Sequence, residues 1–280
     1  MVKYIFGEVE NNMTSNLPEG FFQWVWYLLQ QYGTLFIQGA LYTLLIAVIG
    51  TIAGCIIGFL VGIVRTIEVN PDANKIKSGL LKGVQWILTA YVEFFRGTPM
   101  IVQSMVIFYG AMEVFGIDMS PLAAGLLVVS INTGAYMAET VRGGIASIDS
   151  GQTEGAKAIG MTHFQTMLYI VLPQTLRNIM PQIGNNLIIN IKDTSVLNVI
   201  SVTELYFAGK SAAGAYYKYF EVFFIICVIY FVMNLAVSRL LRLIEKKMDG
   251  PDSYKLVTSD YMSGEITENS STIKIKGGKQ

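Results

Sequence analysis

The chain has 280 residues, of which 52% are hydrophobic and 14% are charged, and its formal net charge is zero. Soluble domains carry about 25% charged residues, whereas several apolar runs here reach the roughly 20 residues that span a bilayer. The composition therefore excludes an ordinary soluble domain, and the absence of excess basic charge argues against a nucleic-acid partner. It predicts an all-α membrane protein.

The N-terminal segment, residues 1–33, ends in the aromatic stretch Gly20 to Gly33. Because Trp and Tyr are enriched at membrane–water interfaces, this stretch is predicted to be an interfacial amphipathic helix. The first membrane span follows at Leu35 to Val64. Four of its glycines recur every four residues, which predicts a smooth face for close helix packing within the subunit rather than at a dimer seam: Gly50, Gly54, Gly58 and Gly62.

Four further spans complete a predicted transmembrane domain over residues 34–246. The second run is too long for one straight crossing and contains the sequence FFRGTP, and the fourth is interrupted by the sequence KDTS. The four runs are Lys77 to Phe115, Pro121 to Val141, Ile179 to Val202 and Phe220 to Ile244. Residues 247–280 are rich in Ser, Thr, Lys, Gly and acids and are predicted to be a disordered cytoplasmic tail.

Basic residues orient these five spans, because Lys and Arg accumulate in cytoplasmic links. The link after the first span, the link after the third and the end of the fifth are all basic, while the link MEVFGIDMS has no Lys or Arg. The predicted topology places the N-terminus outside and the C-terminus in the cytoplasm. The outer link around Glu204 to Lys218 carries two lysines and fits less well. Glu204, at the outer end of the fourth span, is expected to be solvated; the alternative is contact with a binding protein.

The segment after the third span, residues 150–174, is too polar to cross a bilayer. Ser150 or Thr153 can cap a first helix, Gly160 suits the left-handed position after its end, and Thr162 can cap a second helix that Pro173 then ends. In the second helix, apolar residues recur at helical spacing: Phe164, Met167, Leu168, Val171 and Leu172. The pattern predicts a cytoplasmic helical hairpin, either packed on its own bundle or docked to a partner.

The spacing within this hairpin resembles the EAA loop of ABC-importer permeases. The matching positions are Glu154, Gly155, Ala156, Gly160, Ile170, Leu172 and Pro173. Gly155 stands where the family usually has Ala. The stretches VEFFRGTPMIVQ, NTGAYMAETVRGGI, LPQTLRNIMPQIGN and IKDTSVLNVISVTEL are similar to the polar-amino-acid uptake group, which includes histidine-, glutamate-, glutamine-, arginine- and opine-type permeases.

This resemblance implies the type I ABC importer permease fold in a bacterial cell membrane. The chain would form a homodimer or a heterodimer with a second permease and be no enzyme itself. Two cytoplasmic ABC ATPase subunits would grip the hairpins and bind ATP and Mg, so no cofactor or metal is expected in this chain. An extracellular binding protein would deliver the amino acid.

Ionisable residues at bilayer depth are costly and are candidates for function. Arg96 lies near the middle of the second run, where Gly97, Thr98 and Pro99 break the helix and point the N-terminus of a second half-helix at the midplane. A half-helix N-terminus beside an arginine suits a substrate carboxylate. The alternative is an ion pair between Arg96 and Glu93 beside a proline kink.

Lys192, Asp193, Thr194 and Ser195 lie at a similar depth in the fourth run. Asp193 could receive an ammonium or guanidinium group while Lys192 neutralises a carboxylate; alternatively, each pairs with a neighbouring span. The resemblance implies that this stretch, with Ser195, borders the substrate cavity. Glu139 and Arg142, three residues apart at the cytoplasmic end of the third span, are predicted to be a structural ion pair.

Two other functions remain open on the residues alone. An ion-coupled secondary transporter also has broken helices and midplane charges, but it predicts an internal repeat that this sequence does not show. A membrane receptor or scaffold for a cytoplasmic partner predicts no substrate flux.

Overall fold

The computed structural model describes residues 17–67 and 75–248, and all regular structure within them is helical. The predicted tail from residue 249 onward and residues 1–16 lie outside the described residues. In chain order the elements are α2 (Phe21–Thr66), α3 (Lys75–Gly97), α4 (Met100–Phe115), α5 (Pro121–Ala146), α6 (Ser150–Ala158), α7 (His163–Thr166), a π-helical turn (Met167–Val171), α8 (Leu172–Asp193), a 3₁₀ helix (Thr194–Ile200), α9 (Leu205–Tyr216) and α10 (Tyr219–Met248).

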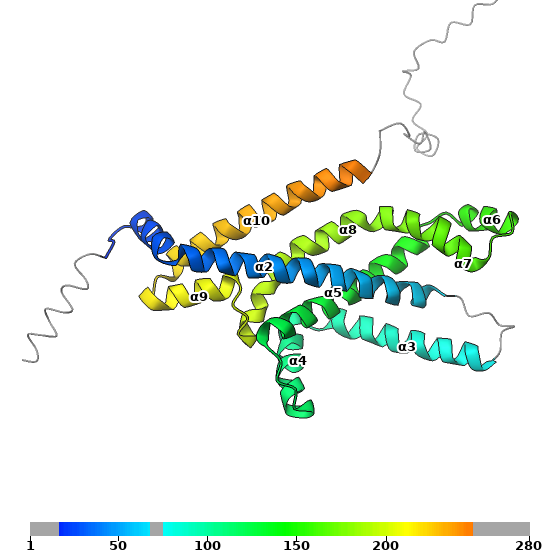
Figure 1. Ribbon diagram of the computed structural model, residues 1–280, viewed down its shortest axis with the longest axis horizontal. Helices are drawn as coiled ribbons and strands as arrows, with labels where there is room; N and C mark the ends of the chain where they lie inside the picture. The colour runs from blue at the N-terminus through cyan, green and yellow to red at the C-terminus, as the bar shows by residue number, and fades with distance from the viewer. Residues whose placement is uncertain (1–16, 68–74, 249–280) are drawn as a thin grey trace, which may run out of the picture.

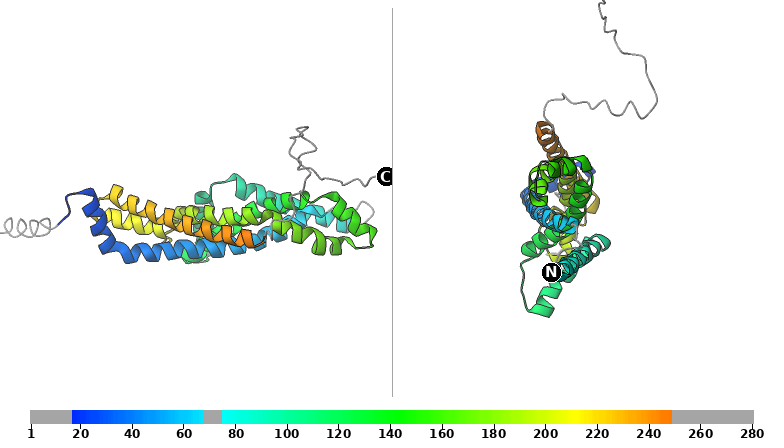
Figure 2. Two further views of the ribbon diagram at one scale, coloured as in Figure 1. Left: turned by 90° about the horizontal axis from the view of Figure 1, so that it is seen from above. Right: turned by 90° about the vertical axis from the view of Figure 1, so that its right-hand side faces the viewer.

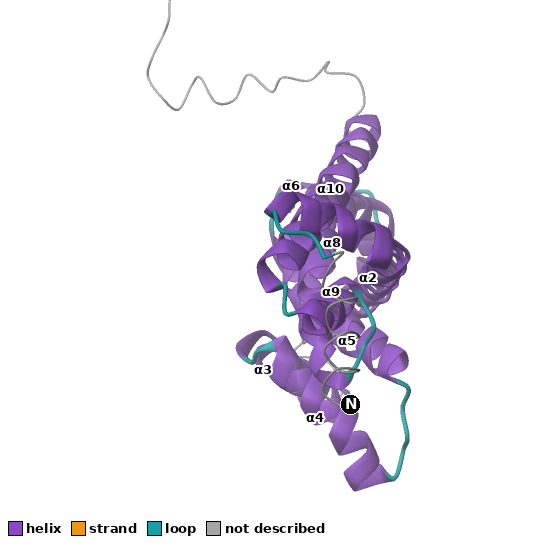
Figure 3. Cartoon of the chain, turned by 90° about the vertical axis from the view of Figure 1, so that its left-hand side faces the viewer, coloured by secondary structure: helices purple, strands orange, loops and turns teal. Residues whose placement is uncertain are grey.

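The helices form an elongated bundle. α2 runs along most of its length, the α6–α7 hairpin lies at one end, and α9 and the start of α2 lie at the other (Figure 1, Figure 2). Viewed down the long axis, α3 and α4 lie to one side of the remaining helices (Figure 3). Three described helices, α2, α5 and α10, are long and apolar enough to cross a membrane, and the bent pair α3–α4 makes a fourth candidate span.

The interfacial stretch and the first span, which the sequence divides at residue 33, form one continuous helix of 46 residues, α2. No proline interrupts this region, so the backbone hydrogen bonds continue through Gly33. The first turns of α2 nevertheless lie at an angle to the rest of the helix (Figure 2). Trp24 and Leu28 in these turns are buried in a cluster with residues of α9 and α10, such as Leu205 and Val222.

The four glycines of α2 face α5, as predicted for packing within the subunit. A Cβ atom at Gly50 or Gly54 would lie 2.5 Å from Val129 or Thr133 of α5. The two remaining glycines meet Met137 and Val141 in the same way. Small residues let two helix backbones approach closely. In lipid the hydrophobic effect does not drive helices together, so the van der Waals contacts of this close approach stabilise the pair. The seam therefore holds the two central helices of the bundle together.

The second apolar run is broken at the predicted place. α3 ends at Gly97, α4 begins at Met100, and the two axes differ in direction by 115°. The first residue of α4 is Met100 rather than Pro99, which occupies the N-cap position without a side-chain cap. α4 consequently leaves the bundle sideways (Figure 1).

The fourth predicted span begins earlier than the sequence analysis placed it. α8 starts at Leu172, passes through Pro181 and ends at Asp193, where a 3₁₀ helix continues to Ile200. Its four asparagines, Asn178, Asn185, Asn186 and Asn190, keep it outside the candidate spans chosen by length and hydropathy. The sequence prediction took the apolar run Ile179 to Val202, interrupted by KDTS, as the span.

Glu204 was expected to be solvated, and this expectation is wrong. The side chain is fully buried at the start of α9. Its carboxylate accepts hydrogen bonds from the backbone N–H groups of Tyr206 and Phe207, at 2.8 and 2.7 Å, and from the Tyr230 hydroxyl at 3.1 Å. Glu204 is thus an N-cap that joins α9 to α10.

Candidate functional site

A polar cavity of about 290 Å³ lies beside the break between α3 and α4. Thr98, Pro99 and Met100 line it from the break, and residues of α5 and α8 close it. Those residues are Asn132, Thr133, Tyr136, Asn186, Ile189, Asn190 and Asp193. The N-terminus of α4 adjoins the cavity, so its free N–H groups contribute a partial positive charge there. Asp193 of α8 also lines the cavity and carries a carboxylate.

Gln103 stabilises the helix break. A helix that stops at Gly97 leaves carbonyl groups of its last turn without intrahelical partners. The buried Gln103 amide donates to the Phe95 and Thr98 carbonyls, each at 2.9 Å, and to the Thr98 hydroxyl at 2.8 Å. Asn132 of α5 donates to Gln103 Oε1 at 2.9 Å. The break is therefore a hydrogen-bonded turn attached to α5.

Asn190 fixes the other wall of the cavity. Its side-chain amide donates to the Thr51 hydroxyl of α2 at 2.8 Å and to the Thr133 hydroxyl of α5 at 2.9 Å. All three side chains are buried. Because an unpaired polar group in this environment would be costly, the network fixes the rotation of α8 relative to α2 and α5. That rotation turns Asp193, three residues further on, toward the cavity.

The hairpin has the caps that the sequence predicts, with one difference. Asp149, not Ser150 or Thr153, caps α6 by accepting from the Gly151 N–H at 2.7 Å. Gly160 has a φ of +83°, and the bonds Gly160 N–H to Lys157 O and Met161 N–H to Ala156 O, both 3.0 Å, form a Schellman motif. Thr162 and Gln165 form a capping box at the start of α7.

Pro173 does not end the second helix of the hairpin, contrary to the sequence prediction. The chain passes through the π-helical turn Met167–Val171 and continues directly into α8, with Pro173 in its first turn. Pro173 directly follows the π-helical turn, whose i→i−5 bond from the Leu172 N–H to the Met167 carbonyl shifts the hydrogen-bond register at this point. The second helix of the hairpin and α8 are consequently one continuous rod.

The hairpin has a packed face and an unpartnered face. Ala156, Thr166 and Val171 are buried against the bundle. Ile159, Phe164 and Tyr169 are 80%, 73% and 65% exposed. The predicted apolar stripe is therefore divided, because Val171 faces the bundle while Phe164 faces away from it. The outer face has the apolar character of a docking surface.

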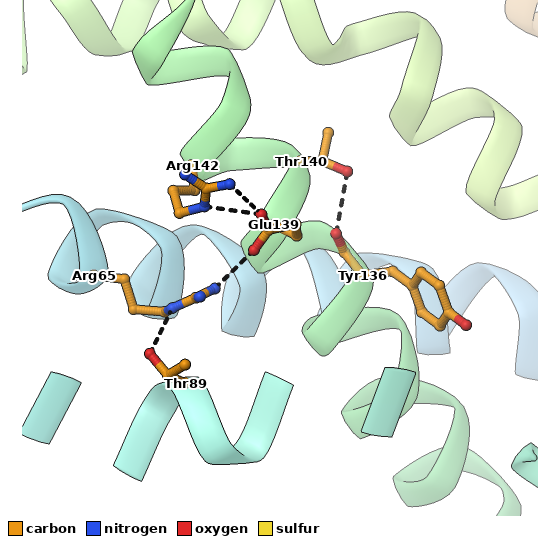
Figure 4. Close-up of polar contacts among 6 residues, drawn as sticks. All are labelled: Arg65, Thr89, Tyr136, Glu139, Thr140 and Arg142. Carbon is orange, nitrogen blue, oxygen red and sulfur yellow. Dashed lines mark hydrogen bonds and ion pairs between the residues drawn. The ribbon is translucent and has the colours of Figure 1, made fainter. Parts of the chain in front are cut away.

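A cluster of charged and polar side chains joins α2, α3 and α5 (Figure 4). Glu139 pairs with Arg142 on α5, as predicted, and also with Arg65 of α2 at 3.0 Å. Arg65 in turn donates to the Thr89 hydroxyl of α3 at 3.3 Å. The Arg65 side chain is only 12% exposed, so this cluster links α2, α3 and α5 through partly desolvated charges.

The sequence profile of the family described as "Binding-protein-dependent transport system inner membrane component" matches residues 78–250. The chain belongs to this family. The glutamine transport system permease protein GlnP of Escherichia coli is 35% identical over 215 residues, which cover 76% of this chain and 93% of that protein. The arginine transport system permease protein ArtQ of Bacillus subtilis is 31% identical and covers 77% and 93%.

Solved structures agree with this assignment. A crystal structure of an amino acid ABC transporter with histidines has a TM-score of 0.70 and 32% identity, and the alignment covers 82% of this permease and 100% of that chain. The MetNI methionine ABC transporter, in an inward-facing conformation, has a TM-score of 0.59 at 19% identity over 75% and 96% of the two chains, and shows the fold alone. The chain is thus a multi-pass membrane permease of the ABC amino-acid group, a transport subunit and not an enzyme.

The permease brings some of the predicted pathway residues together and not others. Thr98 and Asp193 line one cavity although they are far apart in the sequence. Arg96 is exposed and lies over the Tyr136 ring, 5.7 Å from its centre, so it adjoins the cavity through that ring. Gly97, Lys192 and Ser195 do not line it. Among the described residues, Arg96 forms no ion pair with Glu93.

Sequence reasoning missed the amide and hydroxyl groups of the cavity. Asn132, Asn186 and Asn190 are polar side chains within long helical runs, and this was the available signal, because such groups in membrane helices are paired with other helices or line a cavity. The sequence prediction considered only ionisable residues at bilayer depth and therefore did not include these amides. Arg65 was also missed as a partner of Glu139, since it entered the prediction only as a marker of orientation.

Proposed function

We propose that this permease forms the translocation pathway of an ATP-driven importer for polar amino acids. The observation that carries the proposal is the polar cavity beside the broken helix, which both the N-terminus of α4 and Asp193 of α8 line. This arrangement is complementary to an amino-acid zwitterion. The transport of glutamine and arginine by the relatives GlnP and ArtQ supports this substrate class.

In this proposal the substrate carboxylate lies at the N-terminus of α4 beside Thr98. The Arg96 guanidinium reaches it by leaving the face of Tyr136. Asp193 receives the α-ammonium group or a cationic side chain, and Asn132 and Asn186 are available to the rest of the substrate. Lys192 and Ser195 do not line the cavity. In this proposal they contact the substrate at another point of the translocation pathway.

Substitution of the charged residues tests the substrate site. Arg96→Lys and Asp193→Asn should each raise the apparent KM for uptake by about tenfold or more, because a hydrogen bond to a charged group contributes about 1.5–3 kcal/mol. The measurement is uptake by the complete transporter reconstituted with its binding protein. Asp118→Asn, an exposed acid outside the cavity, is the matched control and should leave the KM unchanged. A normal KM in Asp193→Asn, in a complex that assembles normally, would contradict the proposed site.

We further propose that the hairpin couples the permease to two cytoplasmic ATPase subunits. Ile159, Phe164 and Tyr169 on its outer face would enter a groove of the ATPase, with Glu154 and Gly155 beside them. Gly160, the Asp149 cap and the Thr162–Gln165 capping box hold the shape of the hairpin. The continuous rod formed by the second hairpin helix and α8 would carry ATPase closure to Asp193 at its far end.

Two substitutions test the coupling role. Gly160→Pro should abolish ATPase association, because proline cannot adopt a φ of +83°, and Glu154→Lys should weaken association by reversing an exposed charge. Co-purification of the ATPase and substrate-stimulated ATP hydrolysis are the measurements. Glu19→Lys reverses an exposed charge at the opposite end of the bundle and serves as the control. If both hairpin variants kept full coupling, the hairpin would not be the joint.

A further inference from the structure

Two adjoining cavities lie where the end of α2 meets the hairpin. One has a volume of about 180 Å³ and the other about 230 Å³. Thr66, His163 and Met167 line both of them, so the cavities share a wall. Neither contains a residue of the polar cavity beside the helix break. They form a separate, two-part site near the predicted cytoplasmic surface of the membrane.

The larger cavity is apolar and continues the outer surface of α2. Its wall includes Ile63 of α2, Ile67 directly after the end of α2, and Leu168 of the π-helical turn. Ile63 lies three residues after Leu60, on the same helix face. That face also carries Ile52 and Ile56, and Ile52, Ile56 and Leu60 are each more than half exposed. An exposed apolar stripe of α2 therefore leads into this cavity.

The smaller cavity is suited to an anion. Lys157 and His163 line it together with Thr153, and its lining contains no carboxylate. The hydroxyls of Thr66 and Thr166, which also line it, donate to the carbonyls of Ile63 and Thr162. Lys157 forms no ion pair with any described residue. Basic pockets at the cytoplasmic ends of membrane helices attract the anionic headgroups of that leaflet. The two cavities thus place an apolar half beside a basic half, as a lipid joins acyl chains to a charged headgroup.

We propose that this pair of cavities binds one anionic glycerophospholipid of the cytoplasmic leaflet. The phosphate lies in the polar cavity near Lys157, and part of an acyl chain lies in the apolar cavity against Ile63, Ile67 and Leu168. The lipid fills the space between α2 and the hairpin. The inference rests on the cytoplasmic orientation of the hairpin in the proposed function.

Native mass spectrometry of the delipidated transporter complex tests the site. The complex is incubated with phosphatidylglycerol or with phosphatidylcholine, and retained lipid is counted on the permease. Lys157→Gln should reduce phosphatidylglycerol retention about fivefold, since one lysine near an anionic headgroup contributes about 1 kcal/mol. Leu168→Trp should fill the apolar cavity and reduce retention of both lipids.

Two control variants test whether the loss of lipid is specific to the two cavities. Lys82→Gln removes an exposed lysine of α3 outside both cavities, and Leu176→Trp enlarges a similarly exposed leucine of α8; both should bind lipid normally. Equal loss in Lys82→Gln, or equal retention of the two lipids by the unsubstituted protein, would overturn the proposal. Displacement of the lipid by soluble glycerol phosphate alone would also overturn it, since the occupant would then be a free phosphate.

Measurements on the assembled complex distinguish a bound lipid from the ATPase as the occupant of the two cavities. Lipid held by the permease alone but absent from the complex would show that the ATPase covers the groove, and the lipid proposal would be wrong. ATP hydrolysis is measured on the same preparations. An active complex without lipid contradicts only the lipid site, whereas failure of the ATPase to assemble contradicts the proposed function.

Discussion

At the scale of single residues, polar side chains at helix ends and breaks carry much of the organisation. Gln103 bonds the turn at the helix break, Asn190 fixes the rotation of α8, and Glu204 caps α9. Each is buried and each has its hydrogen bonds satisfied by another element or by a free helix end. Such groups contribute little net energy when paired and cost much when one partner is removed.

Glu204→Gln should destabilise the permease. The carboxylate of Glu204 accepts three hydrogen bonds through two oxygens, whereas an amide has one oxygen and would direct an N–H toward a donor. We expect a loss of about 1–3 kcal/mol, measured as a lower thermal unfolding midpoint in detergent.

Glu221→Gln is the control for this change. Glu221 pairs with Lys218 three residues away at 3.9 Å, and such loose pairs contribute about 0–1 kcal/mol. Equal shifts of the unfolding midpoint in the two variants would mean that the cap at α9 has no special role.

At the scale of elements, the close contact between α2 and α5 requires glycine on the contact face of α2, because a Cβ atom there would clash with α5. Gly54→Ala should place a Cβ atom 2.5 Å from Thr133 Cβ and force the helices apart. The expected cost is about 1–3 kcal/mol, typical of overpacking. Unfolding midpoints in detergent measure it.

Gly83→Ala in α3 provides the comparison for the seam. A Cβ atom there has no other atom within 4 Å, so the substitution should be neutral or gain up to about 1 kcal/mol of helix stability. A destabilisation of Gly83→Ala that matched Gly54→Ala would show that helix propensity, and not the seam, dominates.

At the scale of the whole molecule, the orientation in the membrane decides what each end of the bundle does. We predict five spans with the N-terminus outside and the hairpin in the cytoplasm. In a background with Cys55 and Cys227 replaced by Ala, a membrane-impermeant maleimide should label Asp118→Cys in intact spheroplasts. It should label Ala158→Cys of α6 only after permeabilisation. The opposite labelling pattern would reverse the topology.

Features that depend on short-range sequence could be predicted, and features that depend on helix rotation could not. The break at Gly97, the left-handed Gly160 and the Thr162 cap follow from residues within a few positions, and the glycine seam follows from spacing within one helix. The hydrogen bond between Asn190 and Thr51 joins residues 139 positions apart. Its existence depends on how three helices are turned about their axes, which no local pattern specifies.

The same limit explains the errors at Glu204 and Pro173. Glu204 follows an apolar run and precedes a link, so its position in the sequence alone predicts a side chain exposed to solvent. Only the return of α10, with Tyr230, buries it. Pro173 is usually a helix terminator, but the π-helical turn before it adjusts the register so that the chain continues as a helix.

The bonding of the helix break bears on how the protein is made. The ribosome delivers α3 and α4 to the membrane before α5, and exposed carbonyl groups at a break would then face lipid without partners. Gln103 lies within eight residues of every carbonyl it satisfies at the break. The bend between α3 and α4 can therefore form during insertion, without waiting for Asn132 to be synthesised.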